Sequence, residues 1–152
     1  LCDRRQRQMC IRDRLYTMPG SGTQICSQFE ELAQVIEQVN LKDKMGVCLD
    51  ASAVWAAGYD IVNDLDGVLA QFDKAIGLDK LLAVHLNDCK EACGAHADRH
   101  ARIGEGAIGF EALSALTNHP ALKEKPFYLE EPLDTLSVYS EDILRFTEAY
   151  QG

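Results

Sequence analysis

Histidines and carboxylates gather in one short stretch of the sequence, HLNDCKEACGAHADRH, which runs from His85 to His100. Asp98 lies two residues before His100, so that a carboxylate and an imidazole are close together in a polar segment. Imidazole nitrogens and carboxylate oxygens are ligands that suit Zn²⁺, or Mn²⁺ and Fe²⁺ where oxygen predominates. Because a single histidine beside an apolar strand is more often structural, a metal site here needs ligands from other parts of the chain.

Two further carboxylates stand at the ends of apolar runs. Asp50 follows GVCL and Glu130 follows FYL, just as His85 ends LLAVH, with Asp88 shortly after it. The carboxyl ends of parallel strands form one edge of a sheet, where both open sheets and barrels place their sites. A metal cluster there could hydrolyse an unactivated phosphodiester, because metals supply a hydroxide and neutralise phosphoryl charge. The predicted ligands are Asp50, His85, Asp98, His100 and Glu130.

The elements that must hold these residues alternate along the chain. Apolar runs predict strands at the start of residues 14–22 and within 45–52, 81–88 and 127–132. Helical periodicity and cap signals predict helices within 27–40, 63–77, 109–118 and 142–150. The expected helix boundaries are Asn63 or Asp64 as a cap, Gly77 as a stop, and Ser137 or Ser140 at the start of the last helix.

This alternation predicts an α/β fold of four parallel βα units. In an open sheet the strand ends spread along a row, whereas in a barrel they converge on one mouth. Metal-type ligands on several strand ends therefore favour a barrel. Since a complete (β/α)8 TIM barrel needs about 250 residues, residues 15–152 are predicted to form half of one. Its two open edge strands would make the isolated half aggregate or pair with another half.

The composition is that of a globular domain without membrane segments. The 152 residues are 47% hydrophobic and 26% charged, which is typical of a folded soluble chain. No apolar run approaches the roughly 20 residues that span a bilayer, and no signal peptide is recognisable, so a cytoplasmic location is expected. The six irregularly spaced cysteines predict free thiols, and Cys89 and Cys93 lack a second pair that would complete a zinc cage.

Residues 1–14, LCDRRQRQMCIRDR, differ from the rest in having five arginines and no apolar periodicity. A basic arm for nucleic acid is one interpretation; the translation of a sequencing-library adapter, which RQMCIRDR resembles, is the one we favour. The domain is therefore assigned to residues 15–152. Without the five Arg and two Asp of the segment, 10 basic and 22 acidic side chains leave a formal charge of −12. Such a surface repels phosphate backbones unless bound cations or further residues invert the local field.

GEGAIG, residues 104–109, formally matches the dinucleotide-binding pattern G-x-G-x-x-G. It follows the polar segment DRHARI instead of a strand, and no ribose-binding acid is placed convincingly downstream. We therefore expect these glycines to shape a turn from a loop into a helix, and we expect no nucleotide cofactor.

A longer pattern resembles a known family. The pattern consists of five motifs in this order along the chain: GVCLD-x-x-x-x-x-AAGYD, HLND, K-x-x-x-G, DRH-x-x-IGEG-x-IG and LEEP. Together they resemble the C-terminal half of endonuclease IV, an AP endonuclease family on a xylose-isomerase-like TIM barrel, from about Leu15 to the C-terminus. The resemblance implies a trinuclear zinc site that cuts double-stranded DNA 5′ to an abasic sugar, in base excision repair, by a complete enzyme that is a monomer.

The resemblance also implies roles for single residues of this chain. Arg99 would face the DNA, and Glu130 would stand close to the attacking hydroxide. The implied zinc ligands are Asp50, His85 and Glu130 for one ion, and Asp98 and His100 for another.

The sequence departs from the family in ways that bear on activity. The family motif L-E-T-M, whose glutamate bridges two metals, reads LYTM here, with Tyr16 in that place. The family histidine three residues after the aspartate of GVC-x-D is Ala53. The N-terminal half, with two further ligand histidines, is not among these residues. Since lost supporting contacts alone weaken metal affinity about 10 to 100 fold, we expect fewer than three zinc ions and almost no activity.

Two other functions compete with this interpretation. A sugar isomerase or epimerase on the same barrel would use strand-end Asp, Glu and His around one divalent metal, but DRH-x-x-IGEG speaks against it. A non-catalytic relative would bind DNA or a partner without cutting, and Tyr16 and Ala53 support that alternative.

Overall fold

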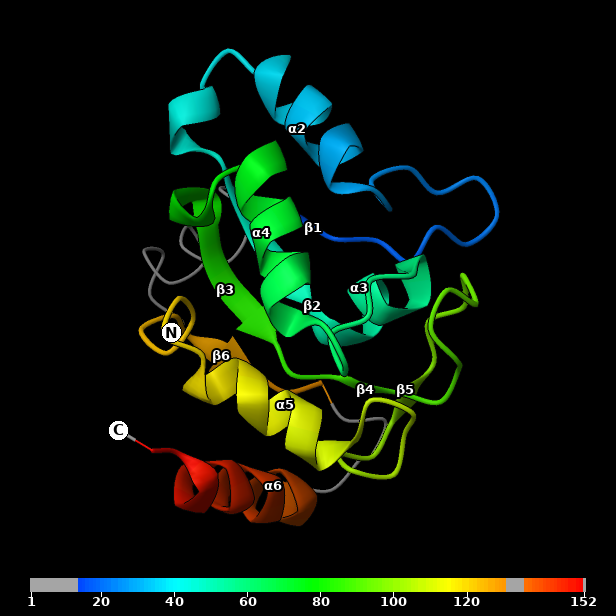
Figure 1. Cartoon of the computed structure of the whole chain (residues 1–152), viewed down its shortest axis with the longest axis vertical. Helices are drawn as coiled ribbons and strands as arrows, with labels where there is room; N and C mark the ends of the chain where they lie inside the picture. The colour runs from blue at the N-terminus through cyan, green and yellow to red at the C-terminus, as the bar shows by residue number, and fades with distance from the viewer. Residues whose placement is uncertain (1–13, 131–135, 152) are drawn as a thin grey trace.

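Four parallel strands form the centre of the structure, a computed structural model that describes residues 14–130 and 136–151 (Figure 1). Their order across the sheet is β1–β2–β3–β6, and all three pairings are parallel. This is the predicted α/β fold with one parallel strand per βα unit. The strands are β1 (Arg14–Tyr16), β2 (Gly46–Asp50), β3 (Leu81–His85) and β6 (Phe127–Tyr128).

Helices connect these strands, and α4 and α5 lie in front of the sheet in Figure 1, with α6 beyond α5. A short antiparallel pair, β4 (Asp88–Cys89) with β5 (His100–Ala101), stands past the end of β3. No helix of the described ranges is long and apolar enough to cross a membrane. The helices are α2 (Phe29–Glu37), α3 (Ala51–Ala57), α4 (Leu65–Ala75), α5 (Gly109–Asn118) and α6 (Leu136–Ala149), with short 3-10 turns at Lys42–Lys44 and Leu78–Lys80.

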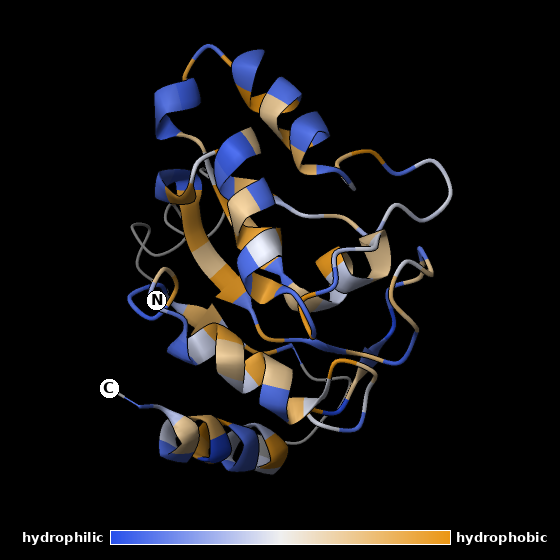
Figure 2. Ribbon diagram, viewed as in Figure 1, coloured by the Kyte–Doolittle hydropathy of each residue, from blue (hydrophilic) through white to orange (hydrophobic). Residues whose placement is uncertain are grey.

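Helix α2 shows why the predicted periodicity was reliable. Phe29, Leu32 and Ile36 recur at helical spacing and are buried, so one stripe of the helix faces the core. The ring of Phe29 stacks on Tyr59 at 4.0 Å between centroids and meets Phe72 of α4 edge-on at 5.2 Å. Figure 2 shows that α2 and α4 each carry hydrophilic as well as hydrophobic residues. Apolar packing therefore holds α2 against α4.

The predicted boundaries of α4 are confirmed. The carboxylate of Asp64 caps the helix by accepting the N–H of Gly67, which satisfies one of the free donors of its first turn. The helix ends at Ala75, and Gly77 follows with a φ of 98°, a positive value that favours glycine. The α5 prediction is confirmed as well, because that helix begins at Gly109 and ends at Asn118.

Other boundaries were wrong. Residues 51–57, of which the first two were assigned to a strand, form the fully buried helix α3. The cause is Asp50, whose side chain accepts the N–H groups of Ser52 and Ala53 and turns the chain from β2 into a helix. Strand β3 ends at His85 and β6 at Tyr128, both earlier than expected, and α6 begins at Leu136.

The four described cysteines, Cys26, Cys48, Cys89 and Cys93, are free thiols as predicted. Cys2, Cys10 and residues 131–135, which include the end of the predicted strand FYLEEP, lie outside the described residues. So does the arginine-rich segment, apart from Arg14, which pairs with Gly46 at the start of β1.

The outer edges of β1 and β6 pair with no other strand among the described residues. An apolar cavity lies beside each of them. The one beside β1 measures about 540 Å³ and includes Leu15 and Ile25, and the one beside β6 measures about 280 Å³ and includes Phe127 and Ile143. Open edges flanked by apolar surface are what half of a closed barrel would leave.

Candidate metal centre

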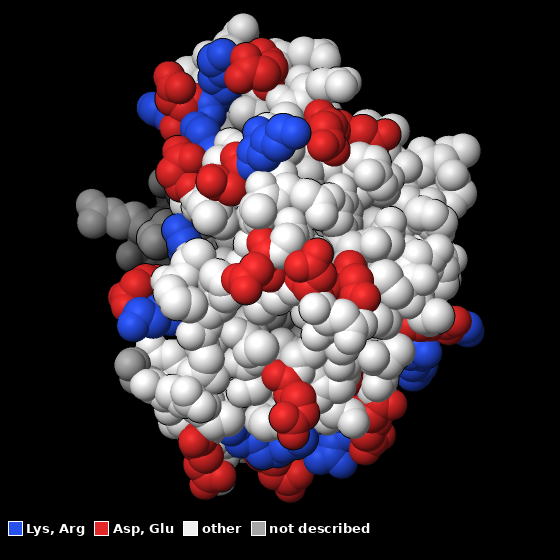
Figure 3. Space-filling view, in the orientation of Figure 1, with Lys and Arg blue, Asp and Glu red and all other residues white. Residues whose placement is uncertain are grey.

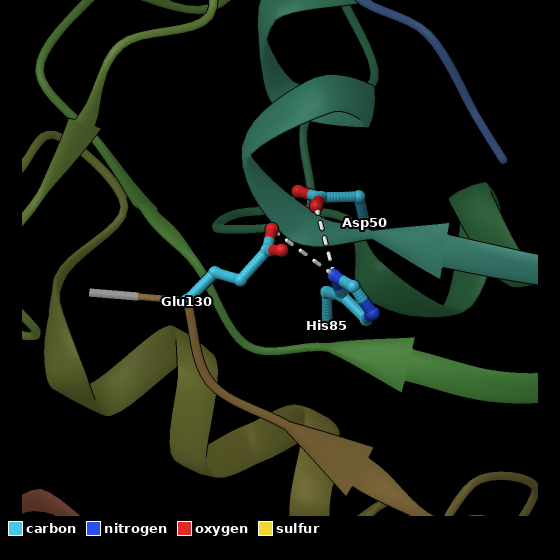
Figure 4. Close-up of side chains that lie close together, drawn as sticks. All are labelled: Asp50, His85 and Glu130. Atoms are coloured by element: carbon cyan, nitrogen blue, oxygen red, sulfur yellow. Dashed lines mark ion pairs between the residues drawn. The ribbon is translucent and has the colours of Figure 1, made fainter. Parts of the chain in front are cut away.

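Three predicted ligands meet at the carboxyl ends of neighbouring strands. Asp50 ends β2, His85 ends β3 in the paired register position, and Glu130 follows β6. Figure 4 shows the three side chains pointing toward one another. Nδ1 of His85 lies 3.5 Å from Oδ2 of Asp50 and 3.6 Å from Oε2 of Glu130. One ligand atom from each residue lies within 4.8 Å of the others, close enough to hold one ion.

Asp50 is the most rigidly held of the three, and its residue is only 7% exposed. Its Oδ1 accepts both N–H groups at the start of α3, whereas Oδ2 faces His85 and accepts Nδ2 of Asn87 at 2.8 Å. Its own N–H donates to the hydroxyl of Thr17 at 2.9 Å. The oxygen that faces the other ligands is therefore fixed in place before any ion binds.

His85 provides the observation that tests whether a metal fits. Its Nδ1 is buried and, among the described residues, takes part in no hydrogen bond. A buried polar atom without a partner normally costs about 1–3 kcal/mol, yet this one points between two carboxylate oxygens. The nearby Asp50 carboxylate is the largest cause that raises the pKa of His85, to about 10, while burial opposes the shift. A divalent cation in that place would satisfy the nitrogen and both oxygens.

Asp98 and His100 lie beside the first three ligands. Oδ1 of Asp98 is 3.4 Å from Nε2 of His100, and both residues share a possible ion site with Asp50. Nδ1 of His100 lies 3.1 Å from the backbone oxygen of Glu130. Because a carbonyl oxygen can only accept, Nδ1 of His100 carries a proton, and a metal would bind at Nε2 after displacing the proton there.

The charges of this second pair depend on each other. Burial opposes the ionisation of Asp98, but the contacts with His100 and the hydroxyl of Ser52 outweigh it and lower the pKa of Asp98. The Asp98 carboxylate in turn raises the pKa of His100 to about 9, against the effect of burial. Asp50 also raises it, so the two ligand sets form one electrostatic unit.

The two positions at which we expect a departure from the family pattern lie in the same cavity, which measures about 370 Å³. Tyr16 and Ala53 line it together with Asp50, Asp98 and His100. The ring of Tyr16 meets the ring of His85 edge-on, at 5.5 Å between centroids. Ala53 lies in the first turn of α3 and carries no atom that could bind a metal. Neither side chain supplies the ligand that the family motif would place there.

Asp88, which sequence reasoning grouped with His85 at the strand end, has another task. Its carboxylate is fully buried and accepts five backbone N–H groups, all at 2.8–3.2 Å. A Cβ at Gly106 would stand 2.3 Å from Oδ1 of Asp88, so only glycine fits there. The predicted turn into a helix is confirmed for GEGAIG. The donors are Cys89, Gly104, Gly106, Ile108 and Gly109.

Arg99 stands between Asp98 and His100 but outside their cavity. It is exposed, and its guanidinium forms an ion pair with Glu91. In Figure 3 the charged side chains across the middle of the visible face are acidic, in line with the net negative charge of the chain. Three residues that contact the ligands were missed by sequence reasoning, because polar residues in apolar runs give no sign of their partners: Thr17, Ser52 and Asn87.

Sequence comparison gives consistent matches. The profile of the xylose isomerase-like TIM barrel family matches residues 15–147. The "Probable endonuclease 4" of Alkaliphilus oremlandii is 54% identical over 137 residues, which are 90% of this chain and 48% of that protein. The protein of the same name from Methanosphaera stadtmanae is 50% identical over 129 residues, 85% of this chain and 46% of its own length.

Structural comparison agrees. The crystal structure of endonuclease IV from Thermus thermophilus superposes with a TM-score of 0.79 at 34% identity, over 88% of this chain and 48% of that one. The chain thus spans about half the length of the curated relatives that it matches.

Proposed function

Because this chain belongs to the xylose isomerase-like TIM barrel family, we propose that it is the ligand-bearing C-terminal half of a zinc-dependent AP endonuclease of the endonuclease IV type. The substrate of the complete protein is double-stranded DNA with abasic sites, cut on the 5′ side of the lesion. One observation carries the proposal. The Nδ1 atom of His85 is buried, makes no hydrogen bond among the described residues, and points toward the carboxylates of Asp50 and Glu130. Its nitrogen and oxygen donors suit Zn²⁺.

Two groups of residues would hold the zinc. Asp50, His85 and Glu130 form the first, and Asp98 and His100 with the shared Asp50 form the second. When bound, zinc lowers the pKa of water and neutralises the charge on the phosphoryl group. Glu130, whose side chain is 64% exposed, faces the cavity and can accept a proton from the attacking water. Arg99 is our candidate for contact with a DNA phosphate, after release from Glu91.

The 152 residues alone should have lost most or all of this activity. Tyr16 occupies the place of a bridging carboxylate, and Ala53 that of an imidazole. The first ion retains Asp50, His85 and Glu130. Of the three ligands that the resemblance implies for the second ion, only Asp98 and His100 are present, with Asp50 close enough to be shared. Loss of a contact that only orients a ligand typically lowers metal affinity about 10 to 100 fold, and loss of a ligand itself should cost more. The zinc occupancy of this chain should therefore fall below that of the complete family site.

A non-catalytic relative is the second candidate, and the same two residues, Tyr16 and Ala53, favour it. In that case the barrel would bind DNA or a partner without cutting. A sugar isomerase has less support, because the named relatives are endonucleases.

The partner and compartment follow from the proposed substrate. We expect the protein to work in the cytoplasm, and no nucleotide cofactor is needed for hydrolysis. The complete protein should be a monomer with a closed barrel. The half-barrel alone should self-associate through the open edges of β1 and β6.

Cleavage of an abasic duplex tests the function. The chain carrying Tyr16→Glu and Ala53→His is co-expressed with the N-terminal half of the Alkaliphilus oremlandii relative and given labelled DNA with one abasic site. We expect cleavage 5′ to the lesion with a 3′-hydroxyl that a polymerase extends. The same pair with Glu130→Gln serves as the control and should lose most activity. Equal cleavage with Glu130→Gln, or of undamaged DNA, would contradict the assignment.

A further inference from the structure

Asn87 lies just past the end of β3 and contacts residues at the ends of the two neighbouring strands, Asp50 of β2 and Glu130 after β6. It lies two residues beyond His85, and its amide contacts the same Asp50 oxygen that faces His85. Its Nδ2 donates to Oδ2 of Asp50 at 2.8 Å, and its Oδ1 accepts the backbone N–H of Glu130 at 3.0 Å. One amide therefore contacts the residues on either side of His85, and it is only 2% exposed.

The chemistry of its partners fixes the orientation of this amide. A backbone N–H can only donate, so the atom that faces Glu130 must be the amide oxygen. The Asp50 carboxylate can only accept while ionised, so the atom that faces it must be the amide nitrogen. If the amide were flipped, its nitrogen would face the N–H of Glu130 and its oxygen would face the carboxylate of Asp50. Donor would then face donor, and acceptor would face acceptor, in a buried space. Asn87 is thereby committed to both contacts and has its oxygen occupied, so it is not itself free to bind a metal.

The contact with Asp50 has a direct consequence for that carboxylate. Oδ1 is occupied by the N–H groups at the start of α3, and Oδ2 is the oxygen 3.5 Å from Nδ1 of His85. The Asn87 amide donates to this same Oδ2 and so sets the direction in which its remaining lone pair points. The contact with Glu130 acts at the backbone and fixes where its exposed side chain enters the cavity.

We propose that Asn87 is a positioning residue, which orients Asp50 and Glu130 around His85 and raises the affinity of this site for a divalent cation. The inference rests on the metal centre proposed above. Contacts that orient metal ligands are typically worth about 10 to 100 fold in affinity. Removal of the amide should therefore weaken zinc binding by that factor, although no atom of Asn87 touches the ion.

A purely structural role makes a different prediction, and Asn118 offers the matched control. Its Nδ2 donates to the backbone oxygens of Ser114 and Ala149, and its Oδ1 accepts the N–H of Gln151. It thus makes comparable contacts between α5 and α6, away from the ligands. Asn118→Ala should lower the melting temperature without altering zinc affinity.

The test is a titration of the 152-residue chain, Asn87→Ala and Asn118→Ala with Zn²⁺ against a chromophoric chelator, at a temperature where circular dichroism shows all three folded. Co²⁺ absorption spectra report the ligand geometry independently of activity. We expect Asn87→Ala to bind zinc about 10 to 100 fold more weakly, with an altered Co²⁺ spectrum, and Asn118→Ala to bind like the parent. If Asn87→Ala does not fold, Asn87→Ser replaces it, because its shorter side chain cannot span both contacts.

The outcomes separate this inference from the function. Parent-like zinc affinity and an unchanged Co²⁺ spectrum in the Asn87 variant would overturn the positioning role and leave the metal centre standing. A parent chain that binds no Zn²⁺ at all would overturn both. If Asn118→Ala loses as much zinc affinity as Asn87→Ala, the loss reflects lower stability of the fold. That result would overturn the positioning role and leave the metal centre standing.

Discussion

Nδ1 of His85 and Oδ2 of Asp50 lie 3.5 Å apart at paired positions of neighbouring strands, and the nitrogen makes no hydrogen bond among the described residues. This spacing is too long for a good hydrogen bond and suits two atoms that bind a common ion. It is the relationship on which the metal centre depends, and the first prediction follows from it.

Zinc should stabilise the folded chain through His85. An ion that binds only the folded state adds about 2.7 kcal/mol at a concentration of 100 times its Kd, so saturating Zn²⁺ should raise the melting temperature. His85→Ala should abolish that rise. His119→Ala is the control, because His119 contacts Asp66 away from the cavity, and it should keep the rise. Scanning calorimetry with and without EDTA measures both, and a full zinc effect in His85→Ala would refute the ligand role.

Asp88→Asn should destabilise the fold by about 2–4 kcal/mol. The substitution turns one oxygen of a fully buried carboxylate into a donor that faces backbone N–H groups, and unsatisfied buried donors carry a penalty of this order. Urea unfolding measures the change. Asp43→Asn, at an exposed position, should alter the free energy of unfolding by less than about 0.5 kcal/mol. If Asp88→Asn lowers the free energy of unfolding no more than Asp43→Asn does, the Asp88 carboxylate does not organise the GEGAIG segment.

Gly106→Ala should be poorly tolerated for a reason of space alone. The added Cβ would lie 2.3 Å from Oδ1 of Asp88 and 2.5 Å from the backbone oxygen of Cys89. At Gly22 a Cβ would meet nothing within 4 Å, although its φ of 60° carries some strain. We expect Gly106→Ala to lower stability by more than about 2 kcal/mol, as at an overpacked core position, and Gly22→Ala by about 1 kcal/mol. Thermal unfolding of the two variants measures the difference. Similar losses of stability in both would contradict the steric crowding predicted at Gly106.

The half-barrel should self-associate. The outer edges of β1 and β6 are unpaired among the described residues, and Ile143 is 55% exposed in the apolar cavity beside β6. Sedimentation velocity should show species larger than 16.8 kDa that increase with concentration, and Ile143→Lys should reduce them. Glu148→Lys, also in α6, controls for the added charge. A monomer at every concentration would exclude the association.

The sequence predicted much of the architecture because its signals are local. The period of Phe29, Leu32 and Ile36 and the cap at Asp64 depend only on neighbouring residues, so α2 and α4 were correct. The convergence of Asp50, His85 and Glu130 followed from their place at strand ends, since parallel strands bring those ends together.

What could not be predicted depends on partners distant in sequence. Asp50 was predicted at the end of a strand, but nothing in the sequence indicated that its carboxylate caps α3 as well as facing His85. Asp88 was only grouped with His85 at the end of a strand, and its five N–H donors from Cys89 and the GEGAIG segment became visible in the structure. Asn87 gave no signal, because a lone amide in an apolar run does not reveal which strands it joins.

Zinc content tests the central claim most directly. The purified chain is measured by elemental analysis beside the same chain carrying Tyr16→Glu and Ala53→His, which add the two ligands that the family motif implies for this cavity. We predict that the original retains little zinc and that the restored chain gains it, because both changes place donor atoms next to existing ligands. An original chain that already holds two or more zinc ions would contradict the ligand assignment.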